Sequence, residues 1–236
     1  MSKGASIKFK SYGESVHKLL ELLKIQNELK KYDKIILKPA VPSNVENSTP
    51  KEFLEEVLKF CLKNKNPIAE VFIAEGADGF STEELFLKLG YKNLAEKYPV
   101  SIIDLNEAET EEIVNDNFMK FSSIHFPKVM LESFIISLPK IAEDSESEIS
   151  GSISAMTGAF PASHYRGFFS RGKSKIRKWP MKYSIHDIIQ CKMPDFAVVD
   201  DKNYFCIKDQ LLAEYQNLTG KLKRADRKCA TFFIFV

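Results

Sequence analysis

The stretch Lys34-Ile35-Ile36-Leu37-Lys38-Pro39 decides the fold, because it is a short apolar run that ends in a lysine and a proline. An uninterrupted apolar run of this length is typical of a strand buried on both faces of a parallel sheet. We place the strand at 33–37, so that Lys38 lies at its carboxyl end, where open α/β sheets bind their ligands. Pro39 cannot donate a hydrogen bond to the ladder, and the polar stretch 40–44 follows it.

Helical and strand patterns alternate through the first hundred residues. The apolar spacing predicts helices at 15–29, at 50–65 with Thr49 as N-cap, from Ser81 to about Gly90, and at 94–97, with strands at 33–37, 69–74 and 100–104. This alternation predicts parallel βαβ units in the N-terminal half.

Three further strands are expected in the second half of the chain. They lie around 134–136, where Ser137-Leu138-Pro139-Lys140 follows, at 196–200 and at 231–236. A helix is expected at 185–192, and 203–229 reads as hairpin or helix. We therefore predict a single α/β domain over 1–236, with a mostly parallel central sheet and helices on both of its faces. A basic and aromatic insertion or lid is expected around 149–186.

Composition sets limits on the function. The chain has 236 residues, of which 44% are hydrophobic and 28% charged, and its net charge is only +2, so its overall charge gives no reason to expect nucleic acid or a membrane surface as a partner. There is no apolar run of membrane-spanning length, and the first residues lack the apolar core of a signal peptide. The four cysteines are scattered, which favours reduced thiols, a cytoplasmic location and no iron–sulfur cluster.

The order of several short motifs resembles one protein family. The motifs are Lys38-Pro39, Ser48-Thr49-Pro50, Ile73-Ala74-Glu75-Gly76, Lys88-Leu89-Gly90-Tyr91 before Ile103-Asp104-Leu105-Asn106, Ser137-Leu138-Pro139-Lys140, Gly158, and Pro194-Asp195-Phe196-Ala197-Val198-Val199-Asp200. Together they resemble the domain of unknown function 362 family over roughly residues 12–200. The resemblance implies an α/β fold with a pocket more than it implies an activity.

The chain departs from that family's pattern at several places. Ala40 takes the position of an asparagine, Met156-Thr157 stands where lysine and asparagine are usual, and an acidic run at 143–148 replaces a lysine and a histidine. The Gly- and Pro-rich segment expected beyond Asp201 is missing. The iron–sulfur cysteine motifs of some relatives are missing as well. These differences leave open whether a family-wide activity is retained.

The candidate site residues follow from the strand ends. Lys38 and Lys140 would clamp an anion, with the polar residues Ser43 and Asn44 beside them, and Glu75 and Asp200 are the acid or base candidates. Acidic side chains also end strands as caps and turn formers, and we do not predict a metal ion. No P-loop or Rossmann fingerprint occurs, so the cofactor stays unknown.

The stretch 149–186 is basic and rich in aromatic residues, and it contains no acidic residue. Arg166 and Arg171 within it are expected to bind the anion if the stretch closes as a lid, and Gly167 and Gly172 would let it move. We therefore predict a protein that binds an anionic small molecule at the carboxyl edge of the sheet. The alternative is a non-catalytic member that binds a partner or, less favoured, nucleic acid through the surface at 164–183. The sequence decides neither between these two readings nor whether the protein is an enzyme.

Overall fold

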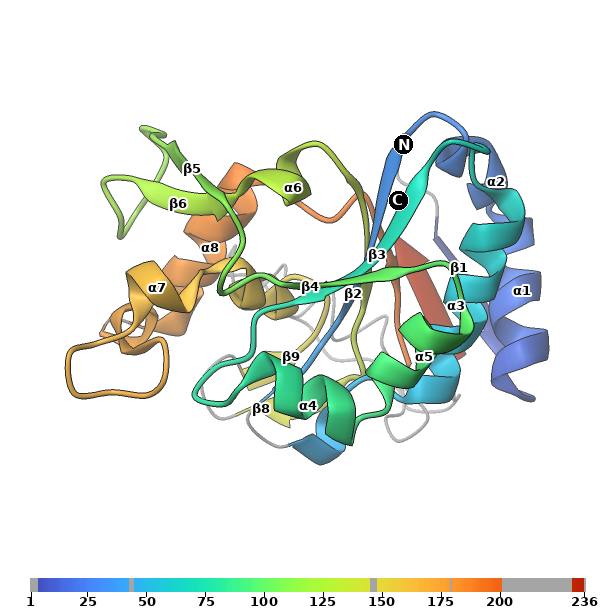
Figure 1. The fold of residues 1–236 in the computed structure, drawn as a ribbon, viewed down its shortest axis with the longest axis horizontal. Helices are drawn as coiled ribbons and strands as arrows, with labels where there is room; N and C mark the ends of the chain where they lie inside the picture. The colour runs from blue at the N-terminus through green and yellow to red at the C-terminus, as the bar shows by residue number, and fades with distance from the viewer. Residues whose placement is uncertain (1–3, 43–44, 145–147, 179, 201–230, 236) are drawn as a thin grey trace, which may run out of the picture.

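A seven-stranded sheet with the order β1-β11-β10-β7-β2-β3-β4 forms the centre of the fold (Figure 1). The structure is a computed structural model that describes residues 4–42, 45–144, 148–178, 180–200 and 231–235. The strands are β1 (Gly4–Lys8), β2 (Lys34–Pro39), β3 (Glu70–Glu75), β4 (Ser101–Asp104), β7 (Phe134–Leu138), β10 (Phe196–Val198) and β11 (Thr231–Phe235). The five from β10 to β4 are parallel, while β11 pairs antiparallel with both β10 and β1. The mostly parallel sheet is therefore confirmed.

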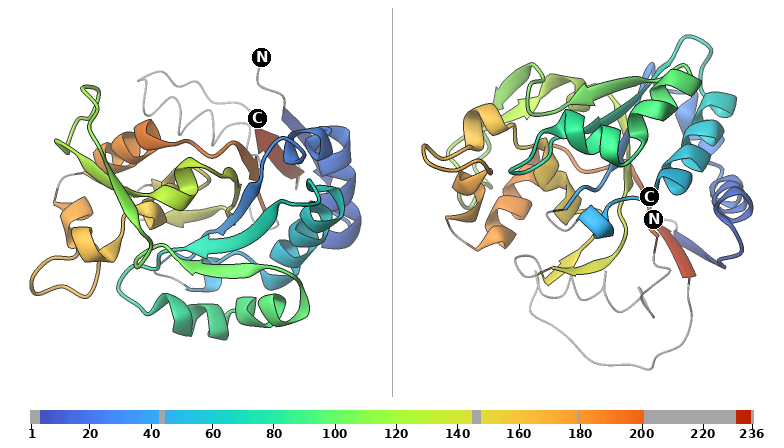
Figure 2. Two further views of the ribbon diagram at one scale, coloured as in Figure 1. Left: turned by 45° about the horizontal axis from the view of Figure 1, so that its top comes forward. Right: turned by 60° about the horizontal axis from the view of Figure 1, so that its bottom comes forward.

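Helices cover both faces of the sheet, as the views in Figures 1 and 2 show. One face carries α1 (Tyr12–Leu22), α2 (Ile25–Leu29), α3 (Lys51–Asn64), α4 (Thr82–Lys88) and α5 (Tyr91–Lys97), and the other carries α6 (Lys128–Leu131), the 3-10 helix η2 (Ser154–Ala159), α7 (Ala162–Tyr165) and α8 (Met181–Cys191). A hydrophobic core lies on each face of the sheet, and successive side chains of β2 point into one core and then the other. Ile35 and Leu37 pack in the core beneath α1–α5, and Ile36 packs in the core on the opposite face. This two-sided burial explains why the strand lacks an alternating polar pattern.

Smaller elements complete the fold. They are the antiparallel pair β5 (Thr110–Ile113) and β6 (Ile124–Pro127), the pair β8 (Ala142–Asp144) and β9 (Glu148–Ser150), and the 3-10 helices η1 (Val45–Asn47) and η3 (Ser174–Arg177). The sequence patterns did not predict these pairs, because such short strands carry almost no periodic signal. The polar region 203–229 lies outside the described residues.

Three local predictions are corrected by the structure. The helix expected at 15–29 is two helices, because Lys24 adopts a left-handed backbone with φ 57° between α1 and α2. Thr49 does not cap α3: Pro50 holds the N-cap position, and Thr49 Oγ1 accepts from Ala40 N at 2.8 Å. Strand β2 also extends through Pro39, which pairs with Leu138 of β7.

Among the described residues, we find no helix that combines the length and the apolar character needed to cross a membrane.

Candidate functional site

Lys38 is a fully buried lysine at the carboxyl end of β2. Strand register pairs it with Ser137 of β7, in the middle of the parallel part of the sheet. Its ammonium donates to Glu75 Oε2 at 2.7 Å and to the carbonyl of Ala155 in η2 at 2.6 Å. A charge this deeply buried is maintained only when it is paired and hydrogen-bonded, so Lys38 is not a solvated strand-end lysine.

Glu75 reaches Lys38 because it ends the neighbouring parallel strand, β3. Parallel strands bring their carboxyl ends to one edge of the sheet, so residues 37 positions apart meet in a buried ion pair. The second carboxylate oxygen, Oε1, accepts from the backbone N–H of Gly76 at 2.9 Å. The predicted neighbourhood of Lys38 and Glu75 is therefore present.

Lys173 adds a second buried ammonium to this edge. It is fully buried, and its Nζ donates to the carbonyl of Gly76 at 2.7 Å and to that of Gly158 at 3.1 Å. Burial lowers the pKa of Lys173 to about 8, although the nearby carboxylate of Glu75 acts in the opposite direction. Sequence reasoning counted Lys173 only as one charge of the basic stretch, and no local signal distinguishes it from its exposed neighbours.

Two glycines bring backbone directly onto the buried charges. A β-carbon on Gly158 would lie 1.7 Å from Glu75 Oε1 and 3.0 Å from Lys38 Nζ, and one on Gly76 would lie 2.5 Å from the carbonyl oxygen of Gly158. A side chain on Gly76 would have to displace the backbone of Gly158, and one on Gly158 would have to displace the buried Glu75 carboxyl or the backbone of η2. We call the group of Lys38, Glu75, Lys173, Gly76 and Gly158 the edge site.

A layer of hydrogen bonds fixes the loops around the edge site. Asp78 accepts from the backbone N–H of Lys173 at 2.6 Å and forms an ion pair with Arg177. Asn106 donates to the carbonyl of Ala77 at 2.9 Å and accepts from the N–H of Ala162 at 3.0 Å. These contacts tie the loop after β3 to the segment that carries Lys173.

Lys140 and Asp200 form a second pair at the same edge of the sheet. They make an isolated parallel bridge beyond β7 and β10. Lys140 donates to the carbonyl of Glu46 in η1 at 2.9 Å, and Asp200 accepts from the hydroxyl of Tyr12 at 2.5 Å. Burial, followed by this hydrogen bond, raises the pKa of Tyr12. These contacts join the second pair to η1 and to α1.

Among the described residues, the other predicted anion ligands, Arg166 and Arg171, stay out of the edge site. Arg166 and Arg171 are exposed, and Ser43 and Asn44 lie outside the described residues. Instead of Arg166 or Arg171, the basic stretch contributes Lys173. No group of three or more histidine, cysteine or acidic side chains among the described residues is arranged to hold a metal ion.

Comparison with solved structures shows the fold. The apoprotein of lactate racemase from Thermoanaerobacterium thermosaccharolyticum is similar with a TM-score of 0.51 at 13% identity, over 84% of this chain and 46% of that one. A protein from Thermotoga maritima is similar with a TM-score of 0.44 at 11% identity, over 80% of this chain and 50% of that one. The chain thus spans about half the length of these two proteins.

Comparison of the sequence shows the family. A search of curated proteins finds no match. The model of a family described as a domain of unknown function (DUF362) matches residues 18–210, a range that includes Lys38, Glu75 and Lys173. The chain belongs to the DUF362 family.

Proposed function

We propose that the protein binds an anionic small molecule at the edge site. The observation that carries this proposal is the buried ammonium of Lys173, whose hydrogen bonds run to two backbone carbonyls. A buried ammonium that contacts only neutral acceptors is energetically costly, as the lowered pKa of Lys173 indicates. An anion in contact with Lys173 would offset that cost.

The arrangement around the two lysines supports a site for oxygen-bearing anions. The carbonyls of Ala155 and Gly158, at the two ends of η2, accept from Lys38 and Lys173 respectively. We propose that, when a ligand binds, oxygens of its carboxylate or phosphate group take the places of these carbonyl oxygens and accept from the two ammonium groups. The ligand would enter by displacing η2 from the edge of the sheet.

Glu75 is the acid or base candidate within this proposal, since its carboxylate contacts Lys38 directly. Asp200 instead accepts from Tyr12, so the proposal rests on Glu75. Fold likeness to the apoprotein of a lactate racemase supports only the choice of lactate, a small carboxylate, as one test anion.

Thermal unfolding at constant ionic strength tests the proposal, with phosphate, lactate and nucleoside monophosphates as probes. A ligand at 100 times its Kd stabilises the folded state by about 2.7 kcal/mol, and the effect saturates, whereas general salt stabilisation does not. We expect a saturable shift that is lost in Lys173→Met and retained in the exposed control Lys178→Met. If no probe gives a saturable shift, or if Lys173→Met retains it, the proposal is wrong.

A further inference from the structure

The loop between α7 and η3 carries two phenylalanines that are almost fully exposed. Phe168 is 96% exposed and Phe169 is 98% exposed, the two highest values among the exposed large apolar residues of the described chain. Figure 1 shows this loop, in gold and orange, projecting from the body of the molecule. We call residues 166–172 the aromatic loop.

The aromatic loop has a defined structure rather than a frayed one. Ser170 donates its backbone N–H to the carbonyl of Gly167 at 3.2 Å, and its hydroxyl accepts from Gly172 N at 3.1 Å. The phenyl rings of Phe168 and Phe169 contact each other edge to face, with centroids 4.8 Å apart. The next residue, Lys173, is buried in the edge site, so the loop is anchored at its base.

Two adjacent aromatic rings remain in water after the chain has folded, so their apolar surface adds almost nothing to the stability of the fold. Each phenylalanine offers a large apolar surface, and burial of such a side chain contributes about 1.5–3 kcal/mol. Single exposed apolar residues are ordinary, but a projecting pair indicates a surface that is buried against a partner.

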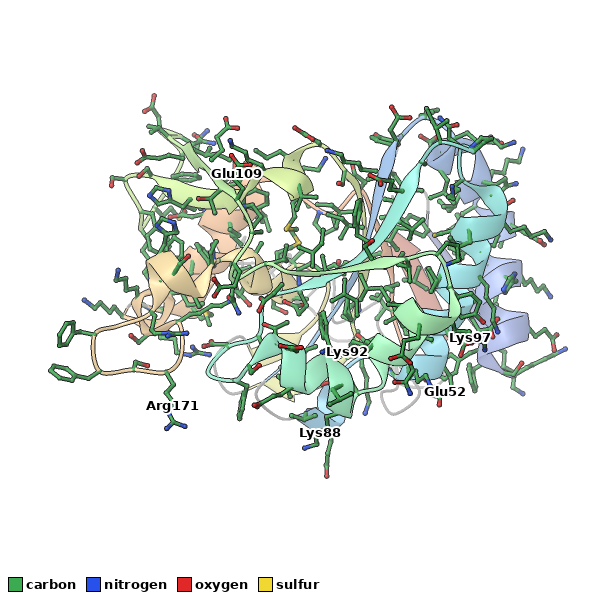
Figure 3. The ribbon with its side chains drawn as sticks, in the orientation of Figure 1. Glu52, Lys88, Lys92, Lys97, Glu109 and Arg171 are labelled. Carbon is green, nitrogen blue, oxygen red and sulfur yellow. The ribbon has the colours of Figure 1, made fainter. Side chains whose placement is uncertain are left out.

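The charges around the rings select the partner's chemistry. Arg166 and Arg171 flank the two rings and are exposed, and Arg171 points away from the body in Figure 3. Lys175 and Lys178 are also exposed, and no acidic residue occurs in 149–186. Asp78, the carboxylate at the base of the loop, is already paired with Arg177. The partner therefore combines an apolar interior with a negatively charged surface.

We propose that the aromatic loop docks on an anionic lipid bilayer, with Phe168 and Phe169 at the boundary of the acyl chains and the arginines at the level of the phosphates. Each basic residue near such a surface contributes about 1 kcal/mol. Single-stranded nucleic acid fits less well, because bases stack on open ring faces along a basic groove, whereas here the rings meet edge to face on a projecting loop.

The expectation of no membrane partner rested on the charge of the whole chain and on the lack of a spanning segment. Neither observation bears on a peripheral contact made by one loop. The proposal also stands apart from the edge site, because it rests on exposed residues that the proposed anion site does not use.

Co-sedimentation with vesicles tests the proposal, using phosphatidylcholine alone and phosphatidylcholine mixed with phosphatidylserine. We expect the wild-type chain to bind the mixed vesicles and Phe168→Ser/Phe169→Ser to lose affinity about tenfold or more, which corresponds to about 1.4 kcal/mol. Arg166→Gln/Arg171→Gln should weaken binding to the mixed vesicles. The matched control is Ile68→Ser, which removes another exposed apolar side chain, 75% exposed, before β3.

Three results would overturn the proposal. They are a wild-type chain that stays in the supernatant with both vesicles, a double phenylalanine variant that binds as well as wild type, and a control variant that loses binding equally. A single-stranded oligonucleotide bound through the same phenylalanines, without vesicle binding, would identify nucleic acid as the partner instead. Matching unfolding curves for the wild-type chain and the variants confirm that the fold is unchanged.

Discussion

The backbone of Gly158 lies so close to Glu75 that a β-carbon there would stand 1.7 Å from the carboxylate oxygen Oε1. Atoms cannot approach to that distance, so the buried Glu75 carboxyl, η2 or both must shift if Gly158 is replaced. Gly158→Ala should therefore destabilise the protein by about 1–3 kcal/mol, the usual cost of overpacking a core.

Denaturant unfolding measures this effect, and Gly13→Ala is the matched control. A β-carbon on Gly13, within α1, would lie 3.7 Å from the Glu56 carboxyl, which is an ordinary contact. Since alanine is a better helix former than glycine, Gly13→Ala should stabilise the protein by about 0.5–1 kcal/mol. Equal effects of the two substitutions would contradict the close approach of Gly158 to Glu75.

The buried pair of Lys38 and Glu75 should behave as one energetic unit. Lys38→Met leaves the Glu75 carboxylate buried without its partner, and Glu75→Gln does the same to the ammonium. Each single substitution should lower the free energy of unfolding by about 3–5 kcal/mol. The double variant should lower it by clearly less than the sum of the two single effects. A double-mutant cycle by urea unfolding measures the coupling, and additive costs would show that the two charges do not depend on each other.

Lys173 should make the stability of the protein rise with pH in the alkaline range. Its pKa is about 8 in the folded state, compared with 10.5 for an ordinary lysine, so the unfolded chain binds the proton more tightly than the folded one between these values. Raising the pH from 8 to above 10 should therefore increase the free energy of unfolding by about 3 kcal/mol, because the folded state no longer has to bury a charged ammonium. Lys173→Met should lack this gain.

The measurement is the difference in unfolding free energy between wild type and Lys173→Met across that pH range. A difference is needed because burial raises the pKa of Cys61 and of Tyr91, and both groups make the folded state less stable as the pH rises. A difference that stays constant with pH would show that Lys173 titrates normally.

Asp187 on α8 should stabilise the protein above the pH at which the unfolded carboxyl ionises. Its carboxylate accepts three backbone N–H groups, from Met119 at 2.7 Å, Lys120 at 2.8 Å and Phe121 at 3.0 Å. Burial opposes the charged form, but hydrogen bonds from His186 and from these backbone groups outweigh it, so the pKa of Asp187 is lowered. Its contribution is therefore lost as the pH falls through the folded pKa.

Asp187→Asn should lower the free energy of unfolding by about 1.5–3 kcal/mol at neutral pH, because the amide keeps only one acceptor oxygen and its NH2 group cannot accept from the backbone N–H groups on the other side. The cost should shrink on acidification, because wild type then loses the same charge. Chemical unfolding at neutral and acidic pH measures both effects. A loss of unfolding free energy that is the same at both pH values would show that the negative charge of Asp187 does not contribute to stability.

Two of the five residues of the edge site, Lys38 and Glu75, could be predicted as site residues from the chain alone. Lys38 and Glu75 end strands that local apolar runs reveal, and the geometry of parallel sheets brings such ends together. The same rule grouped Lys140 and Asp200 with them. In the structure Lys140 and Asp200 form a bridge with each other, and their side chains bond to the carbonyl of Glu46 and the hydroxyl of Tyr12.

Local apolar patterns were enough to predict the alternation of helices and strands, and hence the parallel sheet, because helix and strand periods are properties of short segments. The patterns could not show which lysine of the basic stretch enters the edge site or which aromatic residues stay in solvent. Lys173 contacts Gly76 across 97 residues of sequence, whereas Phe168 and Phe169, only a few positions away, are left in solvent. Such long-range contacts depend on how packed segments meet in space, and no local pattern of residues encodes that.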